Sequence, residues 1–389
     1  MRVVVLSESY ERGGLSEHVR AVSLSMLDLG HDVSVLVNVD KSAWKIIEND
    51  SVLSSRVHLY SAVYTPGAAG SKIFQALISV AVILLEFPLL QRFRRRQLAR
   101  ALEALECEHL VVSNGGFPGG LYCLAAVDLM RRKGFRPVLF VNSLYSPRAF
   151  RFAPWVGRSL RRVLKRSTIA VPSAAVAHSL EKVSPQTQVN VVPNYVELVP
   201  GEKRPLASYP ETFTVVCPAG FFRYKGHPDL IDAANLLSNL GLPIFVKFYG
   251  TGDSKYLSQL RANVSSKGLG NRVTFHDFED DKAELYKSAD LVVLPSRSAE
   301  AFGLVLVEAM SLGIPVVGSR TGGIPDVIGS EADELVYDSG NFDQMSQIIL
   351  KLMTDRSYYT FWSKHFLQRF HQTFSKEKWT EGLSALSKI

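Results

Sequence analysis

Two glutamates eight residues apart, Glu300 and Glu308, are the side chains of this sequence whose types and spacing most suggest chemistry. Glu308 lies inside an apolar stretch, residues 305–310, where an ionised carboxylate buried without partners would be costly. We expect it to accept hydrogen bonds from ligand hydroxyl groups; the alternative is a surface glutamate on an amphipathic helix. The residues just before this stretch would present backbone N–H groups at a helix start, which favours an anion; they are Phe302, Gly303 and Leu304.

A second candidate site is the loop 218–226, in which Arg223 and Lys225 stand just before a predicted helix. A guanidinium fork and an ammonium point charge near a helix start suit a diphosphate group. The alternative is a solvated loop whose charges are incidental. The sequence favours the diphosphate site.

Near the N-terminus, Gly13 and Gly14 form a predicted turn that would let the backbone approach a ligand. The turn lacks the three-glycine dinucleotide fingerprint and the Gly-Lys-Ser/Thr of a phosphate loop, so a tight turn without a ligand is an equal alternative. His18 follows on the predicted helix. It could approach the reacting centre, but a lone histidine more often only caps such a loop.

Strand-like and helix-like segments alternate along the chain, as in the strand 2–7, the helix 16–29 and the strand 32–37. This order is typical of parallel sheets with helices on both faces. The sequence therefore predicts an α/β protein with two Rossmann-like, doubly wound domains facing a cleft, and ligands bound beyond the carboxyl ends of the strands. The predicted parts are an N-terminal domain (1–197), a C-terminal domain (198–365) that begins with a Pro- and Gly-rich linker (198–209), and C-terminal helices (366–389) packing back on the N-terminal domain.

The element from Glu300 to Glu308 resembles the donor-site signature of retaining, nucleotide-sugar-dependent glycosyltransferases of family 4, which have the GT-B fold. Further similar segments cover residues 189–330 almost continuously: 192–197, 249–253, 289–296, 313–317 and 321–326. The N-terminal domain matches through Gly13-Gly14 and its strand order, as expected of the domain that carries the acceptor.

The resemblance implies a role for each candidate residue. Glu308 would hold the ribose hydroxyls of the donor, and Glu300 would bond the transferred sugar near its reacting face. Arg223 and Lys225 would neutralise the diphosphate leaving group, and His18 would lie on the acceptor side. The other donor contacts would come from Gly13, Gly14, Gly220, Gly250, His276 and Phe278, and from the backbone of Phe302, Gly303 and Leu304.

Two positions depart from the family pattern. Gly220 stands where the family often has an arginine, and Asn114 stands where many members have a histidine. Asn114 can orient a hydroxyl but is a poor general base. The resemblance implies a front-face mechanism in which the departing phosphate oxygen can take the acceptor's proton, while the protein supplies positioning and charge stabilisation. No Asp-x-Asp pair is placed for a metal, and we expect no metal and no cofactor besides the nucleotide diphosphate sugar.

The charge is unevenly distributed. Residues 1–200 hold 24 Lys and Arg against 15 Asp and Glu (+9), and residues 201–389 hold 20 against 22 (−2), which gives the net +7. The excess lies in residues 73–100 and 148–166, where apolar residues adjoin arginine clusters, as in interfacial membrane helices. We expect peripheral binding to an anionic membrane surface; the alternative is a buried helix with solvated arginines. No segment resembles a nucleic-acid-binding module.

The three cysteines lack paired spacing, which excludes a disulfide scaffold and favours the reducing cytoplasm. The longest apolar segment, residues 73–90, is interrupted by polar residues, and we do not expect it to span a membrane. The predicted protein is a cytoplasmic retaining glycosyltransferase at the inner face of the membrane, acting on a glycan or lipid-linked glycan. The alternatives are a sugar-nucleotide epimerase or phosphorylase on the same fold, or a non-catalytic nucleotide-sugar-binding subunit.

Overall fold

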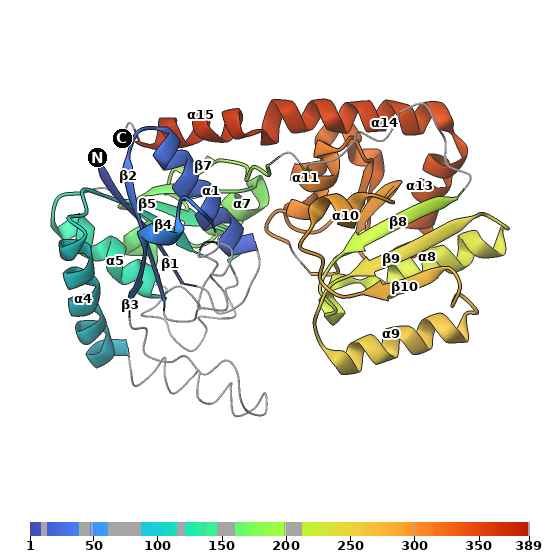
Figure 1. Ribbon diagram of the computed structural model, residues 1–389, viewed down its shortest axis with the longest axis horizontal. Coiled ribbons are helices and arrows are strands. Elements are labelled where there is room, and N and C mark those ends of the chain that lie inside the picture. Colours follow the sequence, from blue (N-terminus) through green and yellow to red (C-terminus); the bar gives the residue numbers. More distant parts are fainter. Residues whose placement is uncertain are drawn as a thin grey trace. The chain divides into compact units, whose positions relative to one another are not determined.

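The computed structural model divides the chain into two compact α/β units (Figure 1). Unit 1 comprises Met1–Val192 and Thr380–Ile389, and unit 2 comprises Pro193–Trp379. The chain therefore passes between the units twice. The structure describes residues 1–8, 14–38, 47, 50–60, 87–114, 121–135, 137–145, 160–197, 199, 212–298 and 300–387.

Unit 1 is built on a seven-stranded parallel sheet in the order β3-β2-β1-β4-β5-β6-β7. The central strands are continuous apolar runs rich in valine and are buried, as parallel strands covered on both faces require. The strands are β1 (Arg2–Glu8), β2 (Asp32–Asn38), β3 (Val57–Tyr60), β4 (His109–Asn114), β5 (Val138–Val141), β6 (Thr168–Val171) and β7 (Val189–Val191). The helices include α1 (Gly14–Asp28), α4 (Phe87–Ala104), α5 (Leu121–Arg132) and α7 (Ala174–Glu181).

Unit 2 repeats this architecture with a six-stranded parallel sheet in the order β10-β9-β8-β11-β12-β13. The strands are β8 (Phe213–Pro218), β9 (Ile244–Tyr249), β10 (Val273–His276), β11 (Leu291–Leu294), β12 (Val316–Ser319) and β13 (Val336–Tyr337). The helices are α8 (His227–Asn239), α9 (Ser254–Ser266), α10 (Lys282–Tyr286), α11 (Leu304–Ser311), α12 (Ile324–Ile328), α13 (Phe342–Thr354), α14 (Arg356–Arg369) and α15 (Lys376–Ser387), which continues into unit 1.

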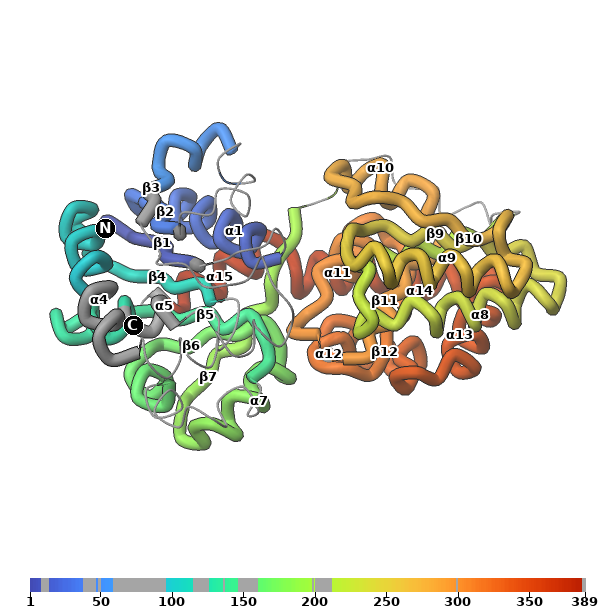
Figure 2. The backbone as a smooth tube through the Cα atoms, turned by 90° about the horizontal axis from the view of Figure 1, so that it is seen from below, coloured from blue at the N-terminus to red at the C-terminus, as the bar shows by residue number. Residues whose placement is uncertain are grey.

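The strand order of unit 2 reverses between β8 and β11, which lie side by side at the centre of the sheet. Figure 2 shows β9 and β12 on opposite sides of β11. In doubly wound sheets, ligands bind beyond the carboxyl ends of the strands at such a switch point. The loop after β8 (219–226) and the loop after β11 (295–303) both start there; the first holds Arg223 and Lys225, and the second holds Glu300.

The ends of the two units differ from the predicted boundaries. The division falls between Val192 and Pro193, ahead of the predicted 197/198, and most of the predicted linker lies outside the described residues. Residues 366–379 belong to unit 2, not to the N-terminal domain as predicted, because aromatic side chains repeating every four residues fill the core of unit 2. They are Trp362, Phe366, Phe370 and Phe374. From Thr380 onward α15 packs in unit 1, where Gly382 lies against Val192.

Candidate active site

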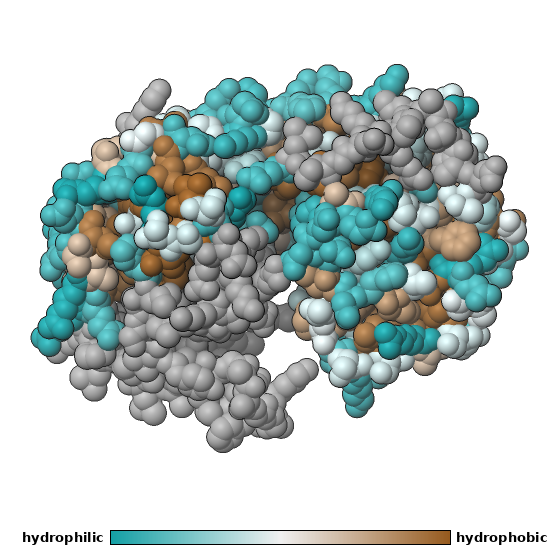
Figure 3. Space-filling model, in the orientation of Figure 1, coloured by the Kyte–Doolittle hydropathy of each residue, from teal (hydrophilic) through white to brown (hydrophobic). Residues whose placement is uncertain are grey.

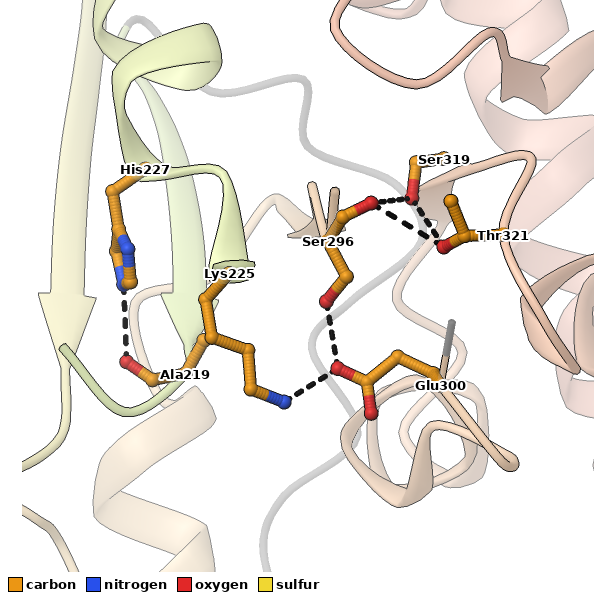
Figure 4. Close-up of polar contacts among 7 residues, drawn as sticks. All are labelled: Ala219, Lys225, His227, Ser296, Glu300, Ser319 and Thr321. Atoms are coloured by element: carbon orange, nitrogen blue, oxygen red, sulfur yellow. Dashed lines mark hydrogen bonds and ion pairs between the residues drawn. The ribbon is translucent and has the colours of Figure 1, made fainter. Parts of the chain in front are cut away.

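An ion pair between Lys225 and Glu300 joins the two loops at the switch point of unit 2 (Figure 4). Lys225 ends the short 3-10 helix η5 (Arg223–Lys225), which leads into α8. Gly226 lets this loop approach β11, because its φ is +72° and a Cβ there would lie 1.8 Å from the Pro295 carbonyl oxygen. The paired side chains remain 20% and 21% exposed, so a ligand can still reach them.

Glu300 is fixed through both its carboxylate and its backbone. The Ser296 hydroxyl donates to Glu300 Oε1 at 2.7 Å. The Gly323 N–H donates to the Glu300 carbonyl oxygen at 2.8 Å, and a Cβ on Gly322 would lie 1.9 Å from the same oxygen. The loop after β11 and the loop after β12 therefore both hold Glu300 in place. Sequence reasoning did not assign these supporting residues, although they lie in segments covered by the family resemblance.

Glu308 is 7% exposed in α11, which rules out a surface glutamate. The Tyr286 hydroxyl donates to Glu308 Oε2 at 2.6 Å, and Lys282 Nζ lies 3.1 Å from Oε1. Burial raises the pKa of Tyr286 well above its usual value and the charge of Glu308 raises it further, so the phenol stays neutral and donates. These two partners come from α10, and the sequence analysis did not identify them.

The start of α11 is shaped by Gly303, the residue before its first turn. Gly303 has a φ of +110°, a left-handed conformation that glycine adopts without strain, and Leu304 begins the helix. The Phe302 side chain is buried and packs edge-on against Phe374, with ring centroids 5.8 Å apart. The side chain of Phe302 is thus part of the core of unit 2, and only its backbone is available for the predicted contact with the nucleotide sugar.

Arg223 is directed to α9 and is not brought to the Lys225–Glu300 pair. Its Nη2 donates to Gln259 Oε1 at 2.6 Å, and its guanidinium carbon lies 5.1 Å from the centroid of the Tyr256 ring. The contact with the diphosphate predicted for Arg223 stays a prediction.

The glycines after β8 and β9 let the two strand ends lie close together. A Cβ on Gly250 would lie 2.7 Å from the Ala219 carbonyl oxygen, and one on Gly220 would lie 3.1 Å from that of Thr251. Gly250 N–H also donates to the carbonyl oxygen of His276 at 3.1 Å. These contacts place the predicted donor residues of β8, β9 and β10 at one edge of the sheet.

His276 and Phe278 follow the same edge. The His276 ring stacks on Tyr249 at 4.6 Å between centroids, and its Nε2 lies 2.8 Å from Thr274 Oγ1. Phe278 is half exposed, and Lys282 Nζ lies 6.0 Å from the centroid of its ring. Because Lys282 also reaches Glu308, the structure brings Phe278 to the side of the site where the predicted ribose-binding carboxylate lies.

In unit 1, Asn114 ends β4 and His18 lies on α1, and both are buried. His18 Nδ1 lies 2.9 Å from Ser113 Oγ, which accepts from Asn142 Nδ2 at 3.2 Å. The direction of the bond between His18 and Ser113 is set by the tautomer of the imidazole. Burial lowers the pKa of His18 to about 3, so it is neutral at pH 7 and a weak base.

The glycine turn of unit 1 is only partly described. Gly14 is the first residue of α1, and Gly13 lies outside the described residues. The donor contacts predicted for Gly13 and Gly14 remain a prediction. In the described ranges, no group of three or more His, Cys, Asp or Glu side chains could hold a metal ion.

The family model described as "Glycosyl transferases group 1" matches residues 200–366. N-acetyl-alpha-D-glucosaminyl L-malate synthase of Bacillus anthracis is 26% identical over 216 residues, which are 52% of this chain and 56% of that protein. Lipopolysaccharide core biosynthesis mannosyltransferase LpsB of Rhizobium meliloti is 30% identical over 33% of this chain and 37% of its own length. The chain thus spans about half or less of the length of these relatives.

Solved structures resemble the whole chain. Anabaena HepE in complex with UDP superposes with a TM-score of 0.78 and 18% identity, covering 100% of both chains. A glycosyltransferase from Rickettsia africae superposes with a TM-score of 0.76 and 14% identity over 100% of this chain and 98% of that one. At these identities the likeness shows the fold, and the predicted pair of Rossmann-like domains of the GT-B type is confirmed.

Proposed function

We propose that this chain, whose residues 200–366 match the family model of group 1 glycosyl transferases, is a retaining glycosyltransferase that moves a sugar from a nucleotide diphosphate sugar to an acceptor hydroxyl. The observation that carries the proposal is the Lys225–Glu300 pair at the switch point of unit 2, with the buried Glu308 on the following helix. A cation and two carboxylates are thereby available for the diphosphate, the sugar and the ribose of one donor.

The donor would bind to unit 2 in an extended arrangement. Lys225 would share its charge between Glu300 and the diphosphate, and Glu308 would accept from ribose hydroxyls while it keeps its own protein partners. HepE has been solved with UDP and with UDP-glucose, and a Mycobacterium tuberculosis relative is named a GDP-mannose-dependent mannosyltransferase. These names support a nucleotide-sugar donor and make uridine and guanosine donors the first to test.

The chemical step would retain the configuration of the sugar. The bond from the anomeric carbon to the diphosphate oxygen breaks, and the acceptor oxygen bonds to that carbon on the same face. The departing phosphate oxygen takes the acceptor's proton, because Asn114 and the neutral His18 are poor bases. Lys225 would stabilise the negative charge that develops on the leaving group. No metal or other cofactor enters this scheme.

We also propose that unit 1 binds an anionic membrane surface, which would favour a lipid-linked glycan as the acceptor and place the protein at the inner face of the cytoplasmic membrane. Residues 73–86 and 148–159 of the two predicted segments lie outside the described residues. The described remainder supports the proposal through exposed cations: Arg96 and Arg100 on α4, and Arg161, Arg162, Lys165 and Arg166 before β6. Hydrophilic side chains lie along the edge of unit 1 where Figure 1 places α4 (Figure 3). Among the described helices, none is long and apolar enough to cross a bilayer.

The proposed activity is tested in two steps. Thermal-shift titrations with UDP-glucose, UDP-N-acetylglucosamine and GDP-mannose should reveal a concentration-dependent stabilisation by one donor. That donor, labelled in its sugar, should then transfer label to a glycan or lipid-linked acceptor with its anomeric configuration retained, as read by NMR, and transfer should persist in EDTA. A product with inverted anomeric configuration would overturn the proposed retaining mechanism. Transfer of the labelled sugar only to inorganic phosphate would indicate a phosphorylase.

A further inference from the structure

Two groups bind the same oxygen of Glu300. Lys225 Nζ forms its ion pair with Oε1, and Ser296 Oγ donates to that same Oε1 at 2.7 Å (Figure 4). Neither contact uses Oε2. The side chain of Glu300 is 21% exposed, whereas Ser296 is fully buried.

Ser296 is itself held in place by side chains at or just after the ends of β12 and β13. Its carbonyl oxygen accepts from Ser319 Oγ at 2.6 Å, from Thr321 Oγ1 at 3.3 Å and from Ser339 Oγ at 3.4 Å. Figure 4 shows Ser319 and Thr321 converging on this carbonyl from the end of β12. The hydroxyl that binds Glu300 is therefore supported by rigid elements of the sheet.

We propose that Ser296 is a positioning residue that turns Glu300 Oε2 toward the sugar of the bound donor; the proposal rests on the function proposed above. A carboxylate oxygen that already accepts from a hydroxyl and an ammonium has little capacity left. The other oxygen keeps its lone pairs for a hydroxyl group of a hexose.

The two partners of Glu300 Oε1 have different roles, and a neutral hydroxyl, that of Ser296, is needed beside the charged Lys225. A bound diphosphate draws the charge of Lys225 toward its own oxygens, which weakens the hold of Lys225 on Glu300. Ser296 carries no charge, does not compete for the diphosphate and keeps its hydrogen bond. The orientation of Glu300 is thus maintained at the stage when the sugar must be recognised.

The test compares a nucleotide sugar with its own nucleotide by calorimetry: UDP-glucose with UDP, and GDP-mannose with GDP. Ser296→Ala should lower the affinity for the nucleotide sugar about tenfold. This is the loss expected when a sugar hydroxyl no longer makes its hydrogen bond to the charged Oε2 of Glu300. The affinity for the nucleotide alone should change less than about twofold, since the nucleotide lacks the sugar that Oε2 would contact. A loss of equal size for both ligands would overturn the proposal.

Two further variants separate positioning from a general effect on the fold. Ser363→Ala removes an equally buried hydroxyl of unit 2, which donates to the Gly313 carbonyl oxygen at 2.6 Å, and should leave the ratio of the two affinities unchanged. In a Glu300→Ala background, Ser296→Ala should have no further effect on that ratio; an undiminished effect would overturn the proposal. A wild-type protein that binds none of the four ligands would instead overturn the proposed function, and this assignment with it.

Discussion

Tyr286 donates a 2.6 Å hydrogen bond to Oε2 of Glu308, and both side chains are buried. Lys282 approaches the other oxygen, so a carboxylate inside an apolar helix has protein partners before any ligand binds. Each carboxylate oxygen can accept a further hydrogen bond, so these partners do not block ribose hydroxyls. Their effect is to stabilise the buried charge of Glu308 and to fix the orientation of its carboxylate.

Tyr286→Phe should lower the free energy of unfolding by about 2 kcal/mol, because it removes a hydrogen bond to a buried charge and keeps the ring. Urea denaturation of the full chain measures this, and calorimetry should show weaker nucleotide binding. Tyr337→Phe is the matched control: Tyr337 is equally buried in unit 2, and its hydroxyl has no partner in the described part of the structure. Equal effects of the two substitutions would contradict the role given to Tyr286.

Lys225→Ala should lower kcat/KM about 100-fold or more, since it removes the charge that stabilises the leaving diphosphate. The folded state should lose little stability, because the ion pair with Glu300 is partly exposed. Lys287→Ala is a suitable control, since it breaks an exposed ion pair with Glu284 in the same unit. Near-wild-type turnover in the Lys225 variant would refute the site assignment.

The sequence predicted the parts of the fold and site that depend on local pattern. Alternating strand and helix signals identified both parallel sheets. The carboxyl ends of neighbouring parallel strands meet at one edge, so loops after β8 and β11 had to approach each other, and Lys225 meets Glu300 there.

The residues that sequence reasoning missed act through long-range hydrogen bonds that leave no local signal. Tyr286 lies on a helix of only five residues, with no periodicity to show which way its hydroxyl points. Ser296 was visible in the family-like segment, but its three carbonyl contacts come from later parts of the chain. The C-terminal helices were predicted to pack on the N-terminal domain, which is wrong for residues 366–379, because a local pattern marks a helix for packing without showing which sheet it covers.

His18 should make unit 1 less stable in acid. Its pKa is lowered to about 3 by burial, whereas an unfolded histidine titrates near its usual 6.5. Below pH 6.5 the histidine of the unfolded chain binds a proton, whereas His18 in the folded state stays neutral. The free energy of unfolding therefore falls toward pH 3 with a limiting slope of about 1.4 kcal/mol per pH unit.

Hydrogen exchange of the β1 and β4 amides between pH 7 and pH 4, corrected for the intrinsic exchange rate, measures this loss within unit 1. His18→Asn should reduce the pH dependence of protection. Ser23→Ala removes a buried hydroxyl of the same helix that does not titrate, and should lower protection equally at every pH. An unchanged pH dependence in the His18 variant would show that other groups cause the acid sensitivity.

Arg96 and Arg100 should contribute to membrane binding. They lie four residues apart on α4 and are exposed, whereas Leu98 and Leu102 are buried, so the charges face outward. Each cation near an anionic surface contributes about 1 kcal/mol, so Arg96→Ala/Arg100→Ala should weaken binding to phosphatidylserine vesicles about 30-fold at low salt. Sedimentation of the full chain with these vesicles measures the change.

The control for this pair is Lys255→Ala/Arg261→Ala, which removes the same charge from exposed positions on α9 of unit 2. Binding through a specific face of unit 1 should leave this variant close to wild type. Equal weakening by both pairs would mean that net charge alone drives association, since only a local surface distinguishes them. A wild-type protein that does not sediment at low salt would refute the membrane proposal while leaving the donor site of unit 2 untouched.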